Sequence, residues 1–533
     1  MKRYQKVLLV ICITLLIMVG GIQIYFSFFL DSQIKQTLTN RVQQSINHSF
    51  SLTINDLDLH LLGRRITISG ATLSSKKQDK KNNLYATIED IHIRGISFWQ
   101  LLIYQKLNLK KVQIINPHIS LTKAPSSNSS ITPRDIRKKL SSNDVLKQQS
   151  IPKFSVTGLS LNYTTKNKQN GSSLSFRDSD IHLYEISLDS AALTSNKIIT
   201  AKNIITDFRD LQYRTANGVY KLSTNQIVFS SFDSSMNIRS LQLKPQFDKA
   251  SFPKQFKYET NRISLNIPTV EIQNLDPLQL NKANGITAQK VQINKPNLDI
   301  FKDKHAPFPP NRQPPLPQQM LKNIPFTLDI DSLSIENGNI KYSQLNPRAD
   351  TTGYILFADL NADFTNLSNL QNRTKKTNPP TLSVRTNVMD SARLQVQFTF
   401  PTSTLKQHIS GHLDSMDMRA FNSALEPMAF VRVDKGQILD MNFDMVLDKQ
   451  EATGKVAFRY KDLKISLLDK ESKKEDFGKK MKSLLANTIK IKSKNRAEDL
   501  RIGKVNFKRI ERKAVFNYWW KSLLSGLKPS IGL

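Results

Sequence analysis

Hydrophobic and polar residues alternate along most of this chain after residue 50. This period of two is typical of β-strands that bury one face. It is clear in the stretches 52–68, 159–163, 181–183 and 263–267, whereas apolar residues at helical spacing gather near the two ends of the chain. The pattern therefore predicts a mainly β protein with many short strands, a few short helices at its flanks and polar turns.

One strand motif occurs twice. Residues 112–121 (VQIINPHISL) return as residues 291–300 (VQINKPNLDI), and in both copies the apolar positions change parity at the proline. A strand alternates faces with period two, so this change predicts an extra residue, placed in a bulge or turn next to the proline. A linker and a further strand follow each copy, which indicates a repeating unit of well over a hundred residues.

The N-terminus carries an apolar run from Val7 to Leu30 that follows Lys2, Arg3 and Lys6. The run is long enough to cross a hydrocarbon core of about 30 Å as a helix. The basic residues predict a single-pass anchor with its N-terminus in the cytoplasm and the rest of the chain outside. A cleaved signal peptide is the alternative, but the run does not end in a small-x-small cleavage site.

Near the C-terminus, six apolar residues follow the spacing of one helix face. They are Phe516, Trp519, Trp520, Leu523, Leu524 and Leu527. Their tryptophans, together with nearby lysines, are typical of a helix at a membrane surface. The alternative is that the same face caps the open end of the sheet.

The composition narrows the possible functions. Among 533 residues, Lys and Arg number 77 and Asp and Glu number 44, which gives a net charge of +33 and predicts attraction to anionic surfaces. The only cysteine, Cys12, lies in the N-terminal apolar run, so disulfide scaffolds and zinc fingers are excluded.

No motif for enzyme chemistry stands out. The chain has no phosphate loop, nucleophile elbow or His-Glu-x-x-His motif. Of the eight histidines only His408 and His412 are close in sequence, and on a strand they lie too far apart to share one metal ion without further ligands. We therefore expect no enzyme activity, no catalytic residues, no metal and no cofactor.

Several of these features together resemble a known family. The N-terminal anchor, the two Val-x-Ile-x-x-Pro strands, residues 411–418 (GHLDSMDM) with Phe421 and Asn422, and residues 454–468 are similar to parts of the AsmA-like and TamB-like envelope proteins. These proteins are relatives of the chorein-type bridge lipid transfer proteins.

The resemblance implies a specific architecture and location. It implies an elongated β-sheet curled into a groove with an apolar interior, which shields lipid acyl chains between the inner and outer membranes of a bacterium. It also implies an anchor in the inner membrane, a periplasmic location for the bulk of the chain, and a role in envelope biogenesis. The expected partners are phospholipid or another acyl-chain lipid, the inner membrane, and an outer-membrane protein or lipid acceptor.

With this architecture in mind, the chain divides into eight segments. They are a transmembrane signal anchor (1–30), an amphipathic helix (31–50), a first β-groove unit (51–124), a linker (125–150), a second β-groove unit (151–301), a proline-rich linker (302–325), a third β-groove unit (326–468), and C-terminal helices with short strands (469–533).

The residue pattern independently favours a binding surface. A sheet with one apolar face and few helices has to cover that face with itself or with a ligand. We expect Ile114, Ile293, Leu333 and Ile335 to line the groove. A scaffold for outer-membrane protein assembly, which would offer a strand edge to its clients, is the alternative function. Nucleic-acid binding is disfavoured, because the aromatic residues alternate with aliphatic ones.

Overall fold

The computed structural model describes residues 50–60, 63–75, 82–97, 108–123, 149–165, 171–188, 200–277, 279, 285–370, 378–401, 404–468 and 491–532. The chain divides into two compact units, Met1–Asp233 and Ser234–Leu533. Both are mainly β, as the alternation predicts. The predicted anchor, almost all of the amphipathic helix 31–50 and most of the linker 125–150 lie outside the described residues. Among the described helices, none is long and apolar enough to cross a membrane.

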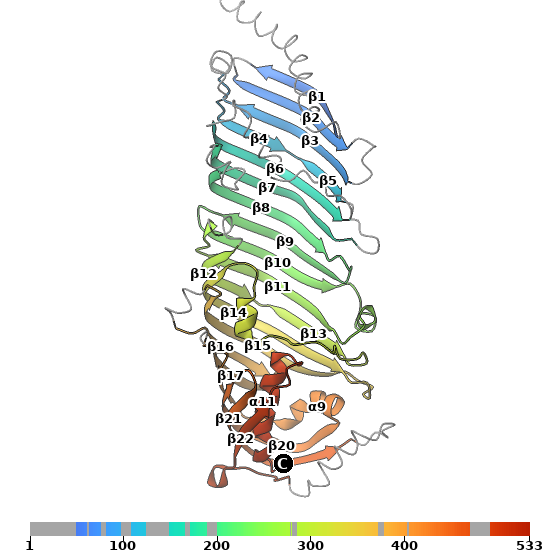
Figure 1. Cartoon of the computed structure of the whole chain (residues 1–533), viewed down its shortest axis with the longest axis vertical. Helices are drawn as coiled ribbons and strands as arrows, with labels where there is room; N and C mark the ends of the chain where they lie inside the picture. Colours follow the sequence, from blue (N-terminus) through green and yellow to red (C-terminus); the bar gives the residue numbers. More distant parts are fainter. Residues whose placement is uncertain are drawn as a thin grey trace, which may run out of the picture. The chain divides into compact units, whose positions relative to one another are not determined.

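Unit 1 is a sheet in which consecutive strands lie side by side (Figure 1). Its strands are β1 (Phe50–His60), β2 (Arg65–Ser75), β3 (Asn82–Arg94), β4 (Lys111–Ile115), β5 (His118–Lys123), β6 (Gln149–Thr165), β7 (Ser173–Leu188), β8 (Thr200–Arg214) and β9 (Tyr220–Ser230). The strands β4 and β5 together take one place between β3 and β6.

Unit 2 repeats this arrangement and adds helices near its C-terminal end (Figure 1). Its strands are β10 (Ser235–Pro245), β11 (Asn261–Gln273), β12 (Ile286–Asn294), β13 (Asn297–Asp303), β14 (Leu328–Leu345), β15 (Gly353–Ser368), β16 (Thr381–Val388), β17 (Ala392–Thr399), β18 (Gln407–Leu413), β19 (Met416–Asp417), β20 (Val431–Leu447), β21 (Glu451–Leu467) and β22 (Ile502–Lys508). Its helices are α7 (Pro317–Lys322), α9 (Asn422–Ala429), α11 (Val515–Ser530) and the short 3-10 helices η3 (Pro253–Gln255), η4 (Met418–Phe421) and η5 (Ala497–Asp499).

The repeated motif forms the split strands β4/β5 and β12/β13. Each split strand is antiparallel to the strand before it and parallel to the strand after it, which is β6 in unit 1 and β14 in unit 2. The described strand pairs are otherwise antiparallel. A parallel pair requires a crossover connection. In unit 2 most of this crossover is residues 304–325, here called the strap, which contains the unpredicted helix α7. The predicted bounds of both linkers overlap neighbouring strands, because β6 begins at Gln149 and β13 continues to Asp303.

The parity change at the proline has a different cause from the one predicted. Asn116 and Lys295, each directly before the proline, have left-handed backbones with φ of 49° and 50°. The register is the same on both sides of the break, since Ile115 faces Thr157 and His118 faces Ser160. The prediction of an inserted residue was therefore wrong, because one left-handed residue changes the side on which the following side chains lie.

Neighbouring strands make the same change at about the same level. The left-handed residues of this line are Gly70, Asn116, Gly158, Asp178 and Asp210 in unit 1, and Ser240, Lys295, Asn337 and Asp359 in unit 2. Side chains of the next strand satisfy the backbone there, as where the Gly158 N–H donates to Asp180 Oδ1 over 3.0 Å. Glycine suits position 158, because its φ is 70° and a Cβ would lie 2.0 Å from Asn116 Oδ1. Such irregularities bend strands, so this line curves each sheet across its strands.

Candidate functional site

Ile114 lies in a continuous row of apolar side chains across unit 1. On β4 it faces Ile91 of β3 on one side and Val156 of β6 on the other. The complete row is Leu57, Ile68, Ile91, Ile114, Val156 and Ile181. A second row on the same face is Leu59, Ile66, Ile93, Val112, Phe154, Leu183 and Ile204. Most of these side chains are half-buried.

The other three predicted groove residues meet in unit 2. Ile293 of β12 faces Ile335 of β14, and Leu333, two residues before Ile335, lies on the same side of β14. Their rows are Ile238, Val270, Ile293, Ile335, Ala362, Val384 and Val396, and Met236, Ile272, Val291, Leu333, Phe364, Leu382, Phe398, Ile409 and Met445. We call the side of each sheet that carries these rows the apolar face. Ile114 belongs to the apolar face of unit 1, and the other three belong to the apolar face of unit 2.

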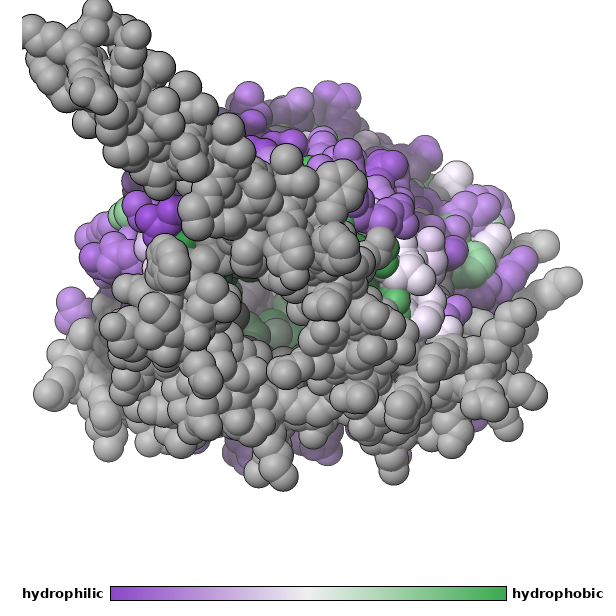
Figure 2. Space-filling view, turned by 90° about the horizontal axis from the view of Figure 1, so that it is seen from above, coloured by the Kyte–Doolittle hydropathy of each residue, from purple (hydrophilic) through white to green (hydrophobic). Residues whose placement is uncertain are grey.

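The opposite side of each sheet is polar. In unit 1 the row between the two apolar rows is Asp58, Thr67, His92, Gln113, Ser155 and His182. In unit 2 it is Asn237, Glu271, Gln292, Ser334, Asp363, Ser383 and Gln397. In the end-on view of Figure 2, hydrophobic residues are visible inside a hollow, and hydrophilic residues predominate along the upper part of the surface.

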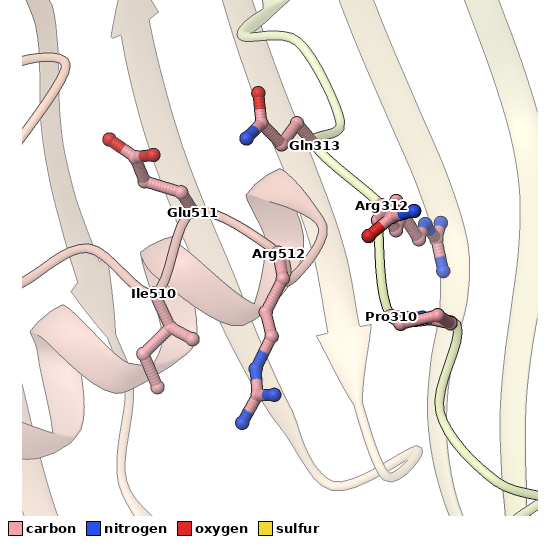
Figure 3. A pocket seen from close by; sticks show the side chains of 7 residues that line it. Pro310, Arg312, Gln313, Ile510, Glu511 and Arg512 are labelled. Atoms are coloured by element: carbon pink, nitrogen blue, oxygen red, sulfur yellow. The ribbon is translucent and has the colours of Figure 1, made fainter.

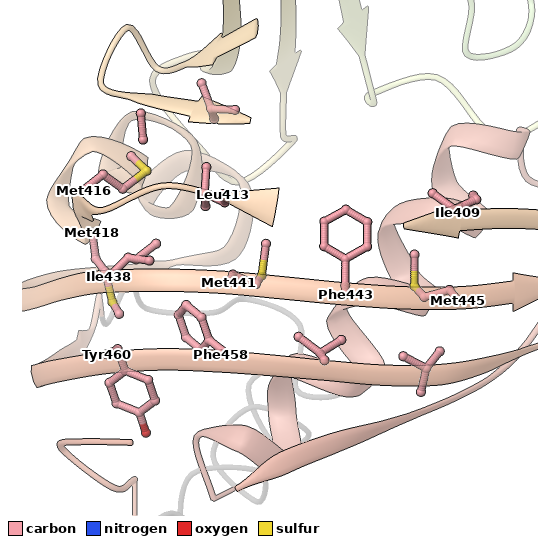
Figure 4. Packing of buried hydrophobic residues seen from close by; sticks show 14 of the residues in the cluster. Ile409, Leu413, Met416, Met418, Ile438, Met441, Phe443, Met445, Phe458 and Tyr460 are labelled. Atoms are coloured by element: carbon pink, nitrogen blue, oxygen red, sulfur yellow. The ribbon is translucent and has the colours of Figure 1, made fainter. Parts of the chain in front are cut away.

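The apolar face is fully covered near the C-terminal end of unit 2. Figure 4 shows Met441, Phe443 and Met445 along β20, beside Phe458 and Tyr460 of β21. Met445 is 2% exposed and Tyr460 is completely buried. The helix α11 packs on β20, β21 and β22 and contributes to this core.

The side of α11 that faces the sheet differs from the predicted one. Its most buried residues are Tyr518, Ser522, Gly526 and Ser530, which the sequence analysis did not select. Three predicted residues, Trp519, Leu523 and Leu527, pack partly against the core, whereas Phe516 and Trp520 are 50% and 42% exposed. The predicted helix is therefore present, but its innermost side is a stripe of small residues around one tyrosine.

Close backbone contact explains the small residues. A Cβ on Gly503 of β22 would lie 1.8 Å from the Gly526 carbonyl oxygen, and a Cβ on Gly526 would lie 2.5 Å from a methyl group of Val456. The spacing of four between Ser522, Gly526 and Ser530 is the sequence signal that could have revealed this contact.

Polar contacts fix α11 in place. The Tyr518 hydroxyl donates to the Asp448 carbonyl oxygen over 3.2 Å, and burial raises the pKa of this phenol. The Trp519 indole N–H donates to Gln407 Oε1 over 2.8 Å. The side chain of Trp519 also packs at 4.9 Å, between ring centroids, on Phe398 of the apolar face. Trp519 thus joins the helix to the row that contains Leu333.

The strap also covers part of the apolar face. Leu316 is completely buried in the core that α11 helps to form. Arg509, just before α11, donates to the Pro314 carbonyl oxygen over 2.7 Å, and Gln318 donates to the Lys406 carbonyl oxygen over 2.8 Å. The proline-rich stretch is therefore a packed part of unit 2.

The two neighbouring histidines have separate partners. His408 Nε2 lies 3.1 Å from Asp444, and His412 contacts Asn442 and Asp414. Within the part of the chain that the structure describes, no three His, Cys, Asp or Glu side chains lie close enough to hold a metal ion.

Comparison with known proteins does not identify this chain. No protein-family model matches it, and no curated protein sequence is significantly similar to it. The apolar face, its covered end and the opposite polar side are therefore the features from which a function has to be argued.

Proposed function

We propose that this chain is an AsmA-like envelope protein whose apolar face binds the acyl chains of lipids and conducts them between the inner and outer membranes. The observation that carries the proposal is the set of continuous apolar rows, most of whose members stay half-buried, on one face of sheets whose other face is polar. Hydrocarbon that covers these half-exposed aliphatic side chains removes apolar surface from water, which lowers the free energy.

The proposed location rests on the N-terminal run 7–30. Anchored in the inner membrane by this run, the sheets would stand in the periplasm, where their net positive charge favours contact with anionic headgroups. Membrane fractionation of the full-length protein, with protease added to spheroplasts, tests this. Digestion of residues beyond 50 only after the outer membrane is opened supports the location, and resistance of these residues contradicts it.

Lipid mass spectrometry of the full-length, detergent-purified protein tests the acyl-chain proposal. Leu333→Asp and Ile114→Asp place a carboxylate within the apolar rows, where it opposes binding of hydrocarbon. We expect each variant to lose most of the co-purified lipid.

Matched controls lie on the adjacent positions of the same strands. Ser332→Asp and Gln113→Asp add the same charge to the polar side and should retain the lipid. Equal lipid content in all four variants would reject an acyl-binding face. Wild-type protein without lipid would also reject it, and would favour the alternative function as a scaffold for outer-membrane protein assembly.

A further inference from the structure

Six basic side chains from three segments gather in unit 2. They are Lys302 at the end of β13, Lys304 and Arg312 in the strap, and Arg512, Lys513 and Lys521 before and within α11; we call them the basic cluster. The Phe308 ring lies among them, with Lys513 Nζ 3.5 Å from its centroid. Lys302 Nζ and Arg512 Cζ each lie 5.8 Å from the same centroid.

Few carboxylates oppose this charge. Glu259 pairs with Lys302 over 2.7 Å, and both side chains are largely buried, at 10% and 13% exposure. Of the other nearby acids, Asp303 pairs with His305 over 2.6 Å and Glu511 is exposed. The basic cluster therefore retains a large positive charge, part of it shielded from water.

The lysines repel each other. Burial lowers the pKa of Lys304, Glu259 opposes this shift, and the charges of Lys302, Lys513 and Lys521 lower the pKa further. Burial likewise lowers the pKa values of Lys513 and Lys521. A bound anion would stabilise the protonated form of all three.

The basic cluster begins where the apolar face ends. Leu298, Ile300 and Lys302 alternate along β13 and so share one face. The row through Ile300 is Ile263, Ile300, Tyr342 and Ile355, and the next row on the same face is Asn261, Lys302 and Gln344. A surface for hydrocarbon thus passes directly into a surface for anions.

An open cavity of about 550 Å³ lies beside the basic cluster. Figure 3 shows Pro310, Arg312 and Gln313 on the strap, and Ile510, Glu511 and Arg512 on the segment before α11. A volume of several hundred Å³ is sufficient for a small ligand or a lipid headgroup.

We propose that the basic cluster and this cavity bind the phosphate of a phospholipid headgroup, while the acyl chains of the same lipid lie on the adjoining apolar face. This rests on the proposed function and adds to it a ligand class and a position for the headgroup. Lysine and arginine side chains around an aromatic ring provide charge-assisted hydrogen bonds to phosphate oxygens, and the Leu298–Ile300 surface accepts the start of the acyl chains.

Binding of three probes to the full-length protein in detergent tests this. The probes are a short-chain phosphatidylglycerol, the diacylglycerol with the same chains, and inorganic phosphate. We expect Lys304→Gln combined with Lys513→Gln to weaken phosphatidylglycerol binding at least about tenfold, since two charge-assisted contacts are lost. Diacylglycerol binding should stay unchanged.

The control variant combines Lys504→Gln with Lys508→Gln, which removes the same charge from exposed positions of β22. It should bind phosphatidylglycerol like the wild type. Melting temperatures of all variants separate loss of the site from loss of the fold.

Equal phosphatidylglycerol affinity in both double variants would overturn the proposal. If inorganic phosphate bound the wild type as tightly as the lipid, the basic cluster would still be an anion site, but its assignment to a lipid headgroup would be overturned. If phosphate bound through the basic cluster while neither lipid bound, the acyl-binding function would be wrong and the anion site would remain.

Discussion

Both units carry alternating apolar rows, but the rows differ in how far other elements cover them. In unit 1 the row through Ile114 is mostly half-buried, and no described element packs over it. At the C-terminal end of unit 2, α11 and the strap cover the corresponding rows, and Ile409 is 2% exposed. Alternation alone is therefore sufficient to form an apolar face. A closed core forms only where a helix such as α11, with small residues on its inner side, packs on that face.

Replacing the buried tyrosine of α11 should have the largest effect. Tyr518→Ala removes a side chain that is 2% exposed, together with its hydrogen bond to Asp448, and should cost about 4 kcal/mol of unfolding free energy. The exposed Trp520→Ala is the control and should cost less than about 1 kcal/mol. Urea unfolding followed by hydrogen exchange of unit 2 peptides measures both. Similar losses would mean that α11 does not pack through Tyr518.

The next prediction compares the two faces directly. Ile409→Ala should destabilise unit 2 by about 3 kcal/mol, because the side chain is fully enclosed. Ile114→Ala should destabilise unit 1 by only about 1 kcal/mol, because its side chain is half-buried. Hydrogen exchange in urea reports each unit by its own peptides. An Ile114→Ala cost as large as that of Ile409→Ala in lipid-free protein would show that another segment covers unit 1.

A smaller loss of unfolding free energy should follow from a substitution that pushes α11 away from the sheet. Gly503→Ala forces a Cβ against the Gly526 carbonyl and should cost about 2 kcal/mol, since neither backbone can move freely. Gly218→Ala is not a suitable control because its φ is 67°, so the exposed Lys504→Ala serves instead. Thermal unfolding measures the difference. No loss for Gly503→Ala would contradict the close packing of α11 on β22.

The smallest expected effect concerns pH. The pKa values of Lys304, Lys513 and Lys521 lie below the ordinary value of 10.5, so between these lowered values and 10.5 the unfolded chain binds more protons than the folded chain. The unfolding free energy of unit 2 should therefore rise with pH between these lowered pKa values and 10.5. Lys304→Gln with Lys513→Gln should flatten this rise, and the Lys504 and Lys508 variant should not. A flat profile in the wild type would contradict the crowding of these lysines.

The sequence was sufficient to predict a mainly β fold and to select apolar residues within its strands. Alternation is a local property, so Ile114, Ile293, Leu333 and Ile335 could be selected without knowing their neighbours. The partners were not predictable, because the parallel pairing of β12 with β14 joins strands separated by the strap. The repeated proline motif marked the place of the strand break, but the continuous line of left-handed residues depends on contacts between neighbouring strands.

The basic cluster and the inner side of α11 could not be found from residue patterns. Lys513 is remote in sequence from Lys302 and Phe308, and it meets them only because the strap passes the segment before α11. The spacing of apolar residues predicted Phe516 and Trp520 on the inner side of α11, whereas the residues buried there include Ser522 and Gly526. Backbone approach favours small side chains, which a search for large apolar residues overlooks.

The two split strands are equivalent in one further respect. The number of residues from Val112 to its partner Phe154 is the same as that from Val291 to its partner Leu333. A split strand and the long strand that pairs with it thus occur twice at the same spacing along the chain, as expected for an internal repeat. Each added block of these strands joins the sheet through the same parallel step and extends it by whole strands. A chain can therefore lengthen such a sheet in increments of one block.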